Sequence, residues 1–278
     1  SNASALIGSV LMRLDNMKIF RILLAGLGLV ATSMSLAFDH SHSELNSILK
    51  NHVIWNDDRR NTTVDYAGLE GDRRVLDRYL ASLASVTQSE FDLFQKRQQL
   101  AFLINAYNAY TISWVSKNYQ NIESIKDLGT LFRSPWKAKR FTLFGTQVSL
   151  DFIEHDLIRE PGRFDDPRIH MAVNCASVGC PALRPEAFTA DRISDQLNDS
   201  VKRFLADAER NRLNGDTWFI SPIFKWYKKD FINTSGSVIN WILTYQKVAD
   251  NSNNKVNAND IEVKFTKYDW SLNIISSK

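Results

Sequence analysis

The segment from Lys96 to Asn118 constrains the fold most, because apolar residues surround the helix that it predicts. On a wheel of about 100° per residue, large apolar side chains fill one side and further apolar residues cover most of the other. A helix of this kind is buried, so we expect it to be the central one. It also contains two amides and two phenols, Asn105, Asn108, Tyr107 and Tyr110. These polar groups need partners inside a core.

The rest of the chain predicts a mixture of helices and strands. Helical spacing occurs over 42–53, 71–83, from 89 onward, after Ser149, and over 191–211, 222–231 and 238–248. Alternation predicts a hairpin over 139–150 and strands over 168–174, 218–221 and 261–265. No βαβ rhythm and no repeat are found. We therefore expect one helix-rich α+β domain, with a small, mostly antiparallel sheet around the buried central helix.

The N-terminal region predicts export. Lys18 and Arg21 precede an uncharged apolar run over 22–36, and Ser35-Leu36-Ala37 places small residues where a signal peptidase cleaves. The run is shorter than the roughly 18–20 residues that span a bilayer. We assign 17–37 as a signal peptide, with an uncleaved N-terminal anchor as the alternative.

The mature protein is then the single domain 38–278, without a stable membrane span, in the periplasm or secreted. Ser1-Asn2-Ala3 looks like a tag remnant, and the residues up to 16 are assigned as translated upstream sequence. Met17 is the natural start of the signal, with Met12 as the other possible start.

Charge and motif content exclude several classes of function. The chain has 34 basic and 31 acidic residues, interspersed, with a net charge of +3, which gives no basic stripe for nucleic acid. It lacks a Gly-rich phosphate loop and a His-Glu-x-x-His motif. Its two cysteines, Cys175 and Cys180, cannot form a four-ligand zinc site by themselves. We predict no cofactor, no metal and no nucleic-acid partner, and an unidentified small-molecule or peptide substrate.

The first candidate for chemistry is the segment 151–159 (DFIEHDLIR). Glu154 falls near the middle of the apolar face of the predicted helix, and His155 lies on its flank. A carboxylate that points into a core is costly unless it is paired or protonated. The alternative to a functional pair is a structural salt bridge of Glu154, with His155 merely on the surface.

The second candidate is the segment 168–183 (RIHMAVNCASVGCPAL), a predicted strand followed by a tight polar loop with Cys175 at the strand end. Such a loop can present a nucleophilic thiol beside backbone N–H groups that stabilise an oxyanion. A disulfide to Cys180, a free catalytic thiol and inert buried thiols remain open. In a regular strand, His170 and Cys175 point to opposite faces, which favours His155 as the base.

Two further segments are rich in aromatic residues. In 221–231 (SPIFKWYKKDF) aromatic side chains alternate with lysines, and the favoured reading is an aromatic anchor with solvated lysines rather than a ligand-binding rim. The segment 268–273 (YDWSLN) is expected to tie the C-terminus into the fold, with Asp269 as a local cap.

The segments INAYNAY (104–110), Ile153-Glu154-His155, HMAVNCASVGCPAL (170–183), SPIFKWYKKDF and YDWSLN together resemble the domain of unknown function 547 family, over most of 91–273. The resemblance supplies a family that includes exported bacterial proteins, but no established reaction. Plant members have Ser-Ser-Pro where this chain has 179–181 and keep a cysteine at the position of Cys175. The resemblance therefore implies a function for Cys175 itself, paired with His155 and with Glu154 nearby.

The leading hypothesis is a thiol hydrolase or acyltransferase whose mechanism is similar to that of papain. Cys175 is the nucleophile, His155 the base, Glu154 its orienting group, and Asn108 part of an oxyanion site, with His170 as the second candidate base. The alternative is a non-catalytic binding domain with a disulfide-stapled loop and an aromatic cleft. A thiol–disulfide exchange protein ranks last, because the Cys-x-x-Cys spacing is missing.

Overall fold

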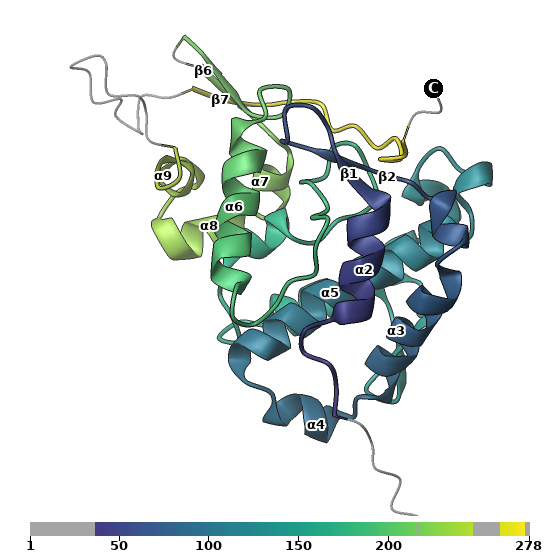
Figure 1. Cartoon of the computed structure of the whole chain (residues 1–278). Coiled ribbons are helices and arrows are strands. Elements are labelled where there is room, and N and C mark those ends of the chain that lie inside the picture. Colours follow the sequence, from purple (N-terminus) through teal and green to yellow (C-terminus); the bar gives the residue numbers. More distant parts are fainter. Residues whose placement is uncertain (1–36, 216, 247–261, 276–278) are drawn as a thin grey trace, which may run out of the picture. The chain divides into compact units, whose positions relative to one another are not determined.

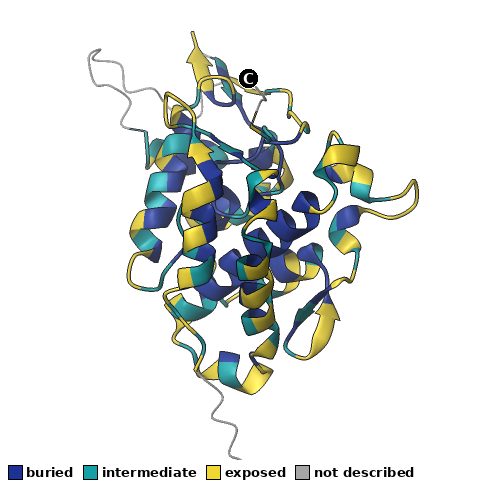
Figure 2. Ribbon diagram, turned by 45° about the vertical axis from the view of Figure 1, so that its right-hand side comes forward, coloured by how far each residue is buried: buried dark blue, intermediate teal, exposed yellow. Residues whose placement is uncertain are grey.

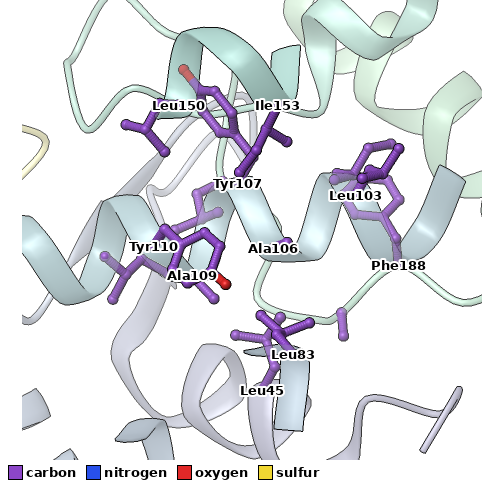
Figure 3. Packing of buried hydrophobic residues seen from close by; sticks show 14 of the residues in the cluster. Leu45, Leu83, Leu103, Ala106, Tyr107, Ala109, Tyr110, Leu150, Ile153 and Phe188 are labelled. Carbon is purple, nitrogen blue, oxygen red and sulfur yellow. The ribbon is translucent and has the colours of Figure 1, made fainter. Parts of the chain in front are cut away.

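Helix α5 (Lys96–Ser116) is the centre of the fold, as the sequence predicts (Figure 1). Every residue from Leu100 to Ser116 is buried, and Figure 2 shows the same burial along the ribbon. Leu45 and Leu83 pack below α5 in the view of Figure 3, whereas Leu150 and Ile153 pack above it. The all-round apolar pattern thus reflects neighbours on opposite sides of the helix.

The computed structural model describes residues 37–215, 217–246 and 262–275. The predicted signal peptide and the residues upstream of it lie outside these ranges, apart from Ala37. Within them, no helix has both the length and the apolar character that crossing a bilayer requires.

The N-terminal part of the domain packs on one side of α5. It consists of α2 (Ser43–His52), β1 (Val53–Trp55), β2 (Thr62–Val64), the 3₁₀ turn η1 (Gly68–Glu70), α3 (Arg73–Ser85) and α4 (Gln88–Leu93). The two strands pair antiparallel. Thr87 and Glu90 form a capping box at the start of α4, which explains why the third predicted helix begins there.

Three short 3₁₀ turns, η2 (Tyr119–Asn121), η3 (Ile125–Leu128) and η4 (Pro135–Lys137), lead to the predicted hairpin of β3 (Phe141–Leu143) and β4 (Thr146–Val148). Phe144 and Gly145 form its turn with φ of 52° and 72°, as a type I′ turn requires. The helical turn η5 (Phe152–Ile158) follows, and Ser149 caps it by accepting a hydrogen bond from the Phe152 N–H at 3.1 Å.

The predicted strand over 168–174 is wrong. The chain there forms the 3₁₀ turn η6 (Pro167–Met171), capped by Asp166, whose side chain accepts the Arg168 N–H. Proline at the first helical position favours this start. His170 and Met171 are both buried, so the apparent alternation of polar and apolar residues did not mark an exposed face.

The second half of the domain consists of α6 (Ile193–Ala206), β5 (Arg212–Asn214), β6 (Thr217–Ile220), α7 (Ile223–Trp226), α8 (Lys228–Ser235), α9 (Val238–Leu243) and β7 (Glu262–Phe265). It has its own apolar cluster, to which the helices and β6 contribute, whereas β5 and β7 are exposed. Strands β5 and β6 pair antiparallel, whereas β6 and β7 pair parallel. The α+β prediction is confirmed. The strands form separate small sheets instead of a single one.

The two amides of α5 hold the chain between η6 and α6. Asn105 donates to the Phe188 carbonyl at 2.8 Å and accepts from its N–H at 3.0 Å. Asn108 donates to the Ala172 carbonyl at 2.9 Å and accepts from the Asn174 N–H at 2.8 Å. Each side chain therefore satisfies two backbone groups in the core, as an added strand would.

We predict that Asn105→Ala lowers the free energy of unfolding by about 2–4 kcal/mol, because two buried backbone groups of Phe188 lose their partner. Chemical denaturation measures the change. Asn51→Ala on the exposed side of α2 is the control and is expected to cost less than about 0.5 kcal/mol. Equal stability of the two variants would contradict the role assigned to Asn105.

Candidate functional site

A cavity of about 240 Å³ lies where η5, the cysteine loop, α7 and the C-terminal segment meet. Four of the five candidate catalytic residues line it: Glu154, His155, His170 and Cys175. Asn108 is not among the described lining residues, and both ends of its amide are engaged with backbone. Asn108 therefore positions the backbone that leads into the cysteine loop and does not form part of an oxyanion site.

Cys175 and Cys180 form a disulfide that closes the loop between them, which is one of the states left open by the sequence. Cys180 is buried, with 2% of its surface exposed, whereas Cys175 is partly exposed. The Ser177 hydroxyl lies 3.2 Å from the Cys175 sulfur, and the Tyr268 hydroxyl lies 3.4 Å and 3.2 Å from the sulfurs of Cys175 and Cys180.

Asn174 shapes the cysteine loop from inside. Its amide donates to the Pro181 carbonyl at 2.9 Å, and its carbonyl accepts the Ala176 N–H at 2.8 Å. Ala176 has a φ of 59°, in the left-handed region that favours glycine. These bonds turn the chain so that the sulfurs face the cavity.

The C-terminal strap, which we define as residues 266–275, lies against the cysteine loop. The Val178 N–H donates to the Ser271 carbonyl at 2.9 Å, and the Gly179 N–H donates to the Asp269 carbonyl at 2.8 Å. The Asp269 carboxylate accepts the Ser271 N–H at 2.9 Å, so the predicted local cap is confirmed. The strap carries Tyr268 to the disulfide.

Glu154 is buried, with 5% of its surface exposed, as the apolar face of 151–159 predicts. Its Oε1 atom has no hydrogen-bond partner, and the described residues contain no ion pair of Glu154. Burial and the neighbouring Glu154 carboxylate raise the pKa of Tyr107 and of Tyr227. A carboxylate surrounded by neutral phenols therefore faces the cavity.

His155 lies at the rim of the cavity, with 39% of its side chain exposed. Its Nδ1 contacts the Arg159 guanidinium, and its Nε2 lies 3.7 Å from Asp151 Oδ1. The ring is thus held on the outer turn of η5, between a cation and a carboxylate.

His170 is buried deeper in the same wall. Its Nε2 lies 2.7 Å from Asp230 Oδ2, and its ring stacks on Tyr227 at 3.8 Å between centroids. Burial lowers the pKa of His170, and Nδ1 has no partner. Burial works against ionisation of Asp230, but hydrogen bonds from His170 and Arg159 hold its pKa below the usual range.

The sequence did not identify Asp230 as a site residue. It lies in the segment 221–231, which the sequence predicted to be an aromatic anchor with solvated lysines. Asp230 and His170 are 60 positions apart, and a 3₁₀ turn instead of a strand aims His170 at α8. A single sequence carries no signal for such a pairing.

Aromatic residues from three parts of the chain form the remaining wall: Trp136 from η4, Trp226 at the end of α7 with Tyr227 after it, and Tyr268 and Trp270 from the strap. Trp226 and Trp270 stack at 5.7 Å between centroids, and Trp226 is 48% exposed. The lysines of 221–231 are exposed, as expected, but Trp226 and Tyr227 face the cavity.

Comparison with known proteins links this site to a described family. Residues 91–205 match the family model described as a protein of unknown function, DUF547. Over these residues the chain is similar to the DUF547 family. The match contains η5, η6 and the cysteine loop, whereas Tyr227, Asp230 and the strap lie beyond it. No curated protein and no solved structure matches the chain.

The resemblance to DUF547 inferred from the sequence motifs is therefore confirmed. The family description names no reaction, so the chemistry of the site has to be argued from its residues. Within the described ranges, no group of His, Cys, Asp and Glu side chains has the arrangement of a metal site.

We predict that Gly179→Ala destabilises the protein by about 1–3 kcal/mol, because the added Cβ would lie 2.8 Å from the Asp269 carbonyl oxygen and 2.9 Å from the Tyr268 ring. Thermal or chemical unfolding measures the loss. Gly71→Ala is the matched control, since its nearest atom lies at 3.5 Å, and we expect a change below about 1 kcal/mol. Tolerance of alanine at 179 would show that the strap is not held as described.

Proposed function

We propose that the reduced form of this protein is a cysteine-dependent acyl hydrolase or acyltransferase. The observation that carries the proposal is the convergence of Cys175, His170 and Glu154 on one cavity. A nucleophile, a histidine with a carboxylate partner and a shielded pocket are the parts that thiol acyl transfer needs.

Cys175 is the better nucleophile of the two cysteines, because it is partly exposed to the cavity whereas Cys180 is buried. A dithiol reductant would convert the disulfide to two thiols and would itself become a disulfide. The hydroxyls of Ser177 and Tyr268 lie within reach of the Cys175 sulfur. Burial raises the pKa of Tyr268 to about 12, so its phenol stays protonated and can donate to a thiolate.

His170 is the base that the contacts favour over His155. Its Nε2 faces Asp230 at 2.7 Å, which leaves Nδ1 as the nitrogen that can accept a proton. The carboxylate orients the imidazole and stabilises its protonated form, as the acidic member of a catalytic triad does. His155 instead lies at the rim of the cavity, with its Nδ1 engaged by the Arg159 guanidinium and its Nε2 near the Asp151 carboxylate.

In the proposed reaction, His170 takes the Cys175 proton and the sulfur attacks the substrate carbonyl carbon. A C–S bond forms, and the carbonyl π electrons move to oxygen. Collapse breaks the bond to the leaving amine or alcohol, which takes the proton from His170. Water, or an acceptor amine or alcohol, then attacks the thioester and releases the Cys175 sulfur, with His170 acting again as base.

We predict that Cys180→Ser, which leaves Cys175 as a thiol, reacts with iodoacetamide at pH 7 about tenfold faster than the same variant carrying His170→Gln. The reason is that a neighbouring imidazole raises the thiolate fraction. Mass spectrometry of the Cys175 peptide gives the rates, and circular dichroism checks that each variant is folded.

His155→Gln in the Cys180→Ser background is the matched control and is expected to leave the rate unchanged. A slower reaction with iodoacetamide for His155→Gln, but not for His170→Gln, would favour the Cys175–His155 pairing inferred from the sequence. If both variants label as fast as Cys180→Ser, and none hydrolyses 4-nitrophenyl acetate faster than its Cys175→Ser counterpart, the catalytic proposal fails.

A second candidate function is a non-catalytic binding domain, and the disulfide favours it because a closed Cys175–Cys180 loop needs no free thiol. The aromatic wall of the cavity would then serve ligand binding alone. Reduction of the native protein distinguishes the two functions. If the protein is a binding domain, reduction leaves ligand binding unchanged and produces no esterase activity.

We also propose that the protein is exported and matures at Phe38, on the strength of the n-region, apolar run and Ser35-Leu36-Ala37 site in the sequence. Expression from Met17 in a bacterium, followed by osmotic release and N-terminal sequencing, is expected to yield a periplasmic chain that begins at Phe38. Recovery of the uncleaved chain in the membrane fraction would instead support an anchor.

A further inference from the structure

We infer that the cavity binds a ligand that carries a primary ammonium or guanidinium group, with Glu154 as its counter-ion. This inference builds on the proposed function, since it names the substrate class of the same site. It starts from an unpartnered atom, because Glu154 is buried and its Oε1 has no hydrogen-bond donor among the described residues. A buried carboxylate oxygen without a donor costs free energy that a ligand N–H group can recover.

The charges around the cavity favour a cation. The described lining residues include two carboxylates, Asp151 and Glu154, and two histidines, but no lysine or arginine. Burial lowers the pKa of His170, so this ring adds no positive charge near neutral pH. Arg159 lies behind the Tyr227 ring at 4.9 Å from its centroid and is paired with Asp230 at 2.7 Å.

The aromatic wall adds a second attraction for a cation. Ring faces of Trp and Tyr attract ammonium and guanidinium groups through their quadrupoles. One such contact exists at the edge of this wall, where Lys126 Nζ lies 3.7 Å from the Trp270 ring centroid. Trp226 lines the same cavity as Glu154 and, with 48% of its surface exposed, offers a further ring face to a ligand.

The neutral phenols around Glu154 explain why a cation is preferred to a second carboxylate or a plain alcohol. Burial and the Glu154 carboxylate raise the pKa of Tyr107 and of Tyr227, so these groups do not ionise near neutral pH. Tyr227 gives Glu154 a neutral hydrogen-bond partner, and no lysine or arginine is among the described residues that line the cavity with it. A volume of about 240 Å³ suits a small ligand, below the roughly 300–1,000 Å³ of drug-sized pockets.

The test titrates the native, oxidised protein with n-butylammonium, n-butanol and n-butyrate while tryptophan fluorescence is recorded. The wall contains Trp136, Trp226 and Trp270, so occupancy is expected to change the emission. We expect n-butylammonium to bind at least about tenfold more tightly than the other two probes. The inference is overturned if n-butyrate or n-butanol binds as tightly, or if none of the probes alters the emission.

Glu154→Gln is expected to weaken n-butylammonium binding by about tenfold and to leave n-butanol unchanged. Glu160→Gln, an exposed residue of the same region that pairs with Arg163, is the matched control and is expected to keep full affinity. If Glu154→Gln does not fold, Trp226→Ala replaces it, because Trp226 is 48% exposed at the cavity. Full affinity in the folded variant would overturn the inference.

The binding test does not require a free thiol, so it separates the inference from the proposed catalysis. Cation-selective binding by the oxidised protein, without esterase activity after reduction, would support the ligand class and refute the catalytic role of Cys175. Esterase activity after reduction, without cation-selective binding, would support the catalytic role of Cys175 and refute the ligand class.

Discussion

The fold depends on a helix that is buried on every side and still carries polar side chains. Burial of α5 is tolerated because the amides of Asn105 and Asn108 each donate one hydrogen bond to the backbone and accept one from it. The backbone partners, at Phe188 and at Ala172 and Asn174, belong to one connected stretch of chain. The central helix therefore fixes both ends of the irregular segment between η6 and α6. That segment contains the cysteine loop, so the buried central helix sets the position of the candidate nucleophile.

Local rules predicted much of the architecture. The all-round apolar pattern of α5, the alternation around Gly145 and the cap at Ser149 each specify structure within a few residues, and each prediction was confirmed. The same holds for Glu154, whose burial follows from helical periodicity alone. The strand expected before Cys175 failed, because a short alternating run cannot be told from a buried 3₁₀ turn when both of its faces are covered.

The site was harder to predict, since its parts come from distant segments. Glu154, the two histidines and Cys175 could be selected as candidates, because a core-facing carboxylate, histidine and cysteine are conspicuous as residue types. Asp230, the partner of His170, could not be predicted, because their contact depends on how α8 packs against η6. The contact of Tyr268 with both sulfurs likewise depends on the strap, which the sequence marked only as an anchor of the C-terminus.

The parallel pairing of β7 with β6 and the docking of the strap have a consequence for biogenesis. The two cysteines are five residues apart and can meet as soon as their loop has formed, whereas the strap follows them in the chain and is therefore made later. A chain interrupted before residue 266 would retain the means to oxidise its loop, yet would lack Tyr268 and Trp270 from the wall. In such a chain the disulfide could form while the cavity wall is still incomplete, so closing the loop and completing the wall are separable events.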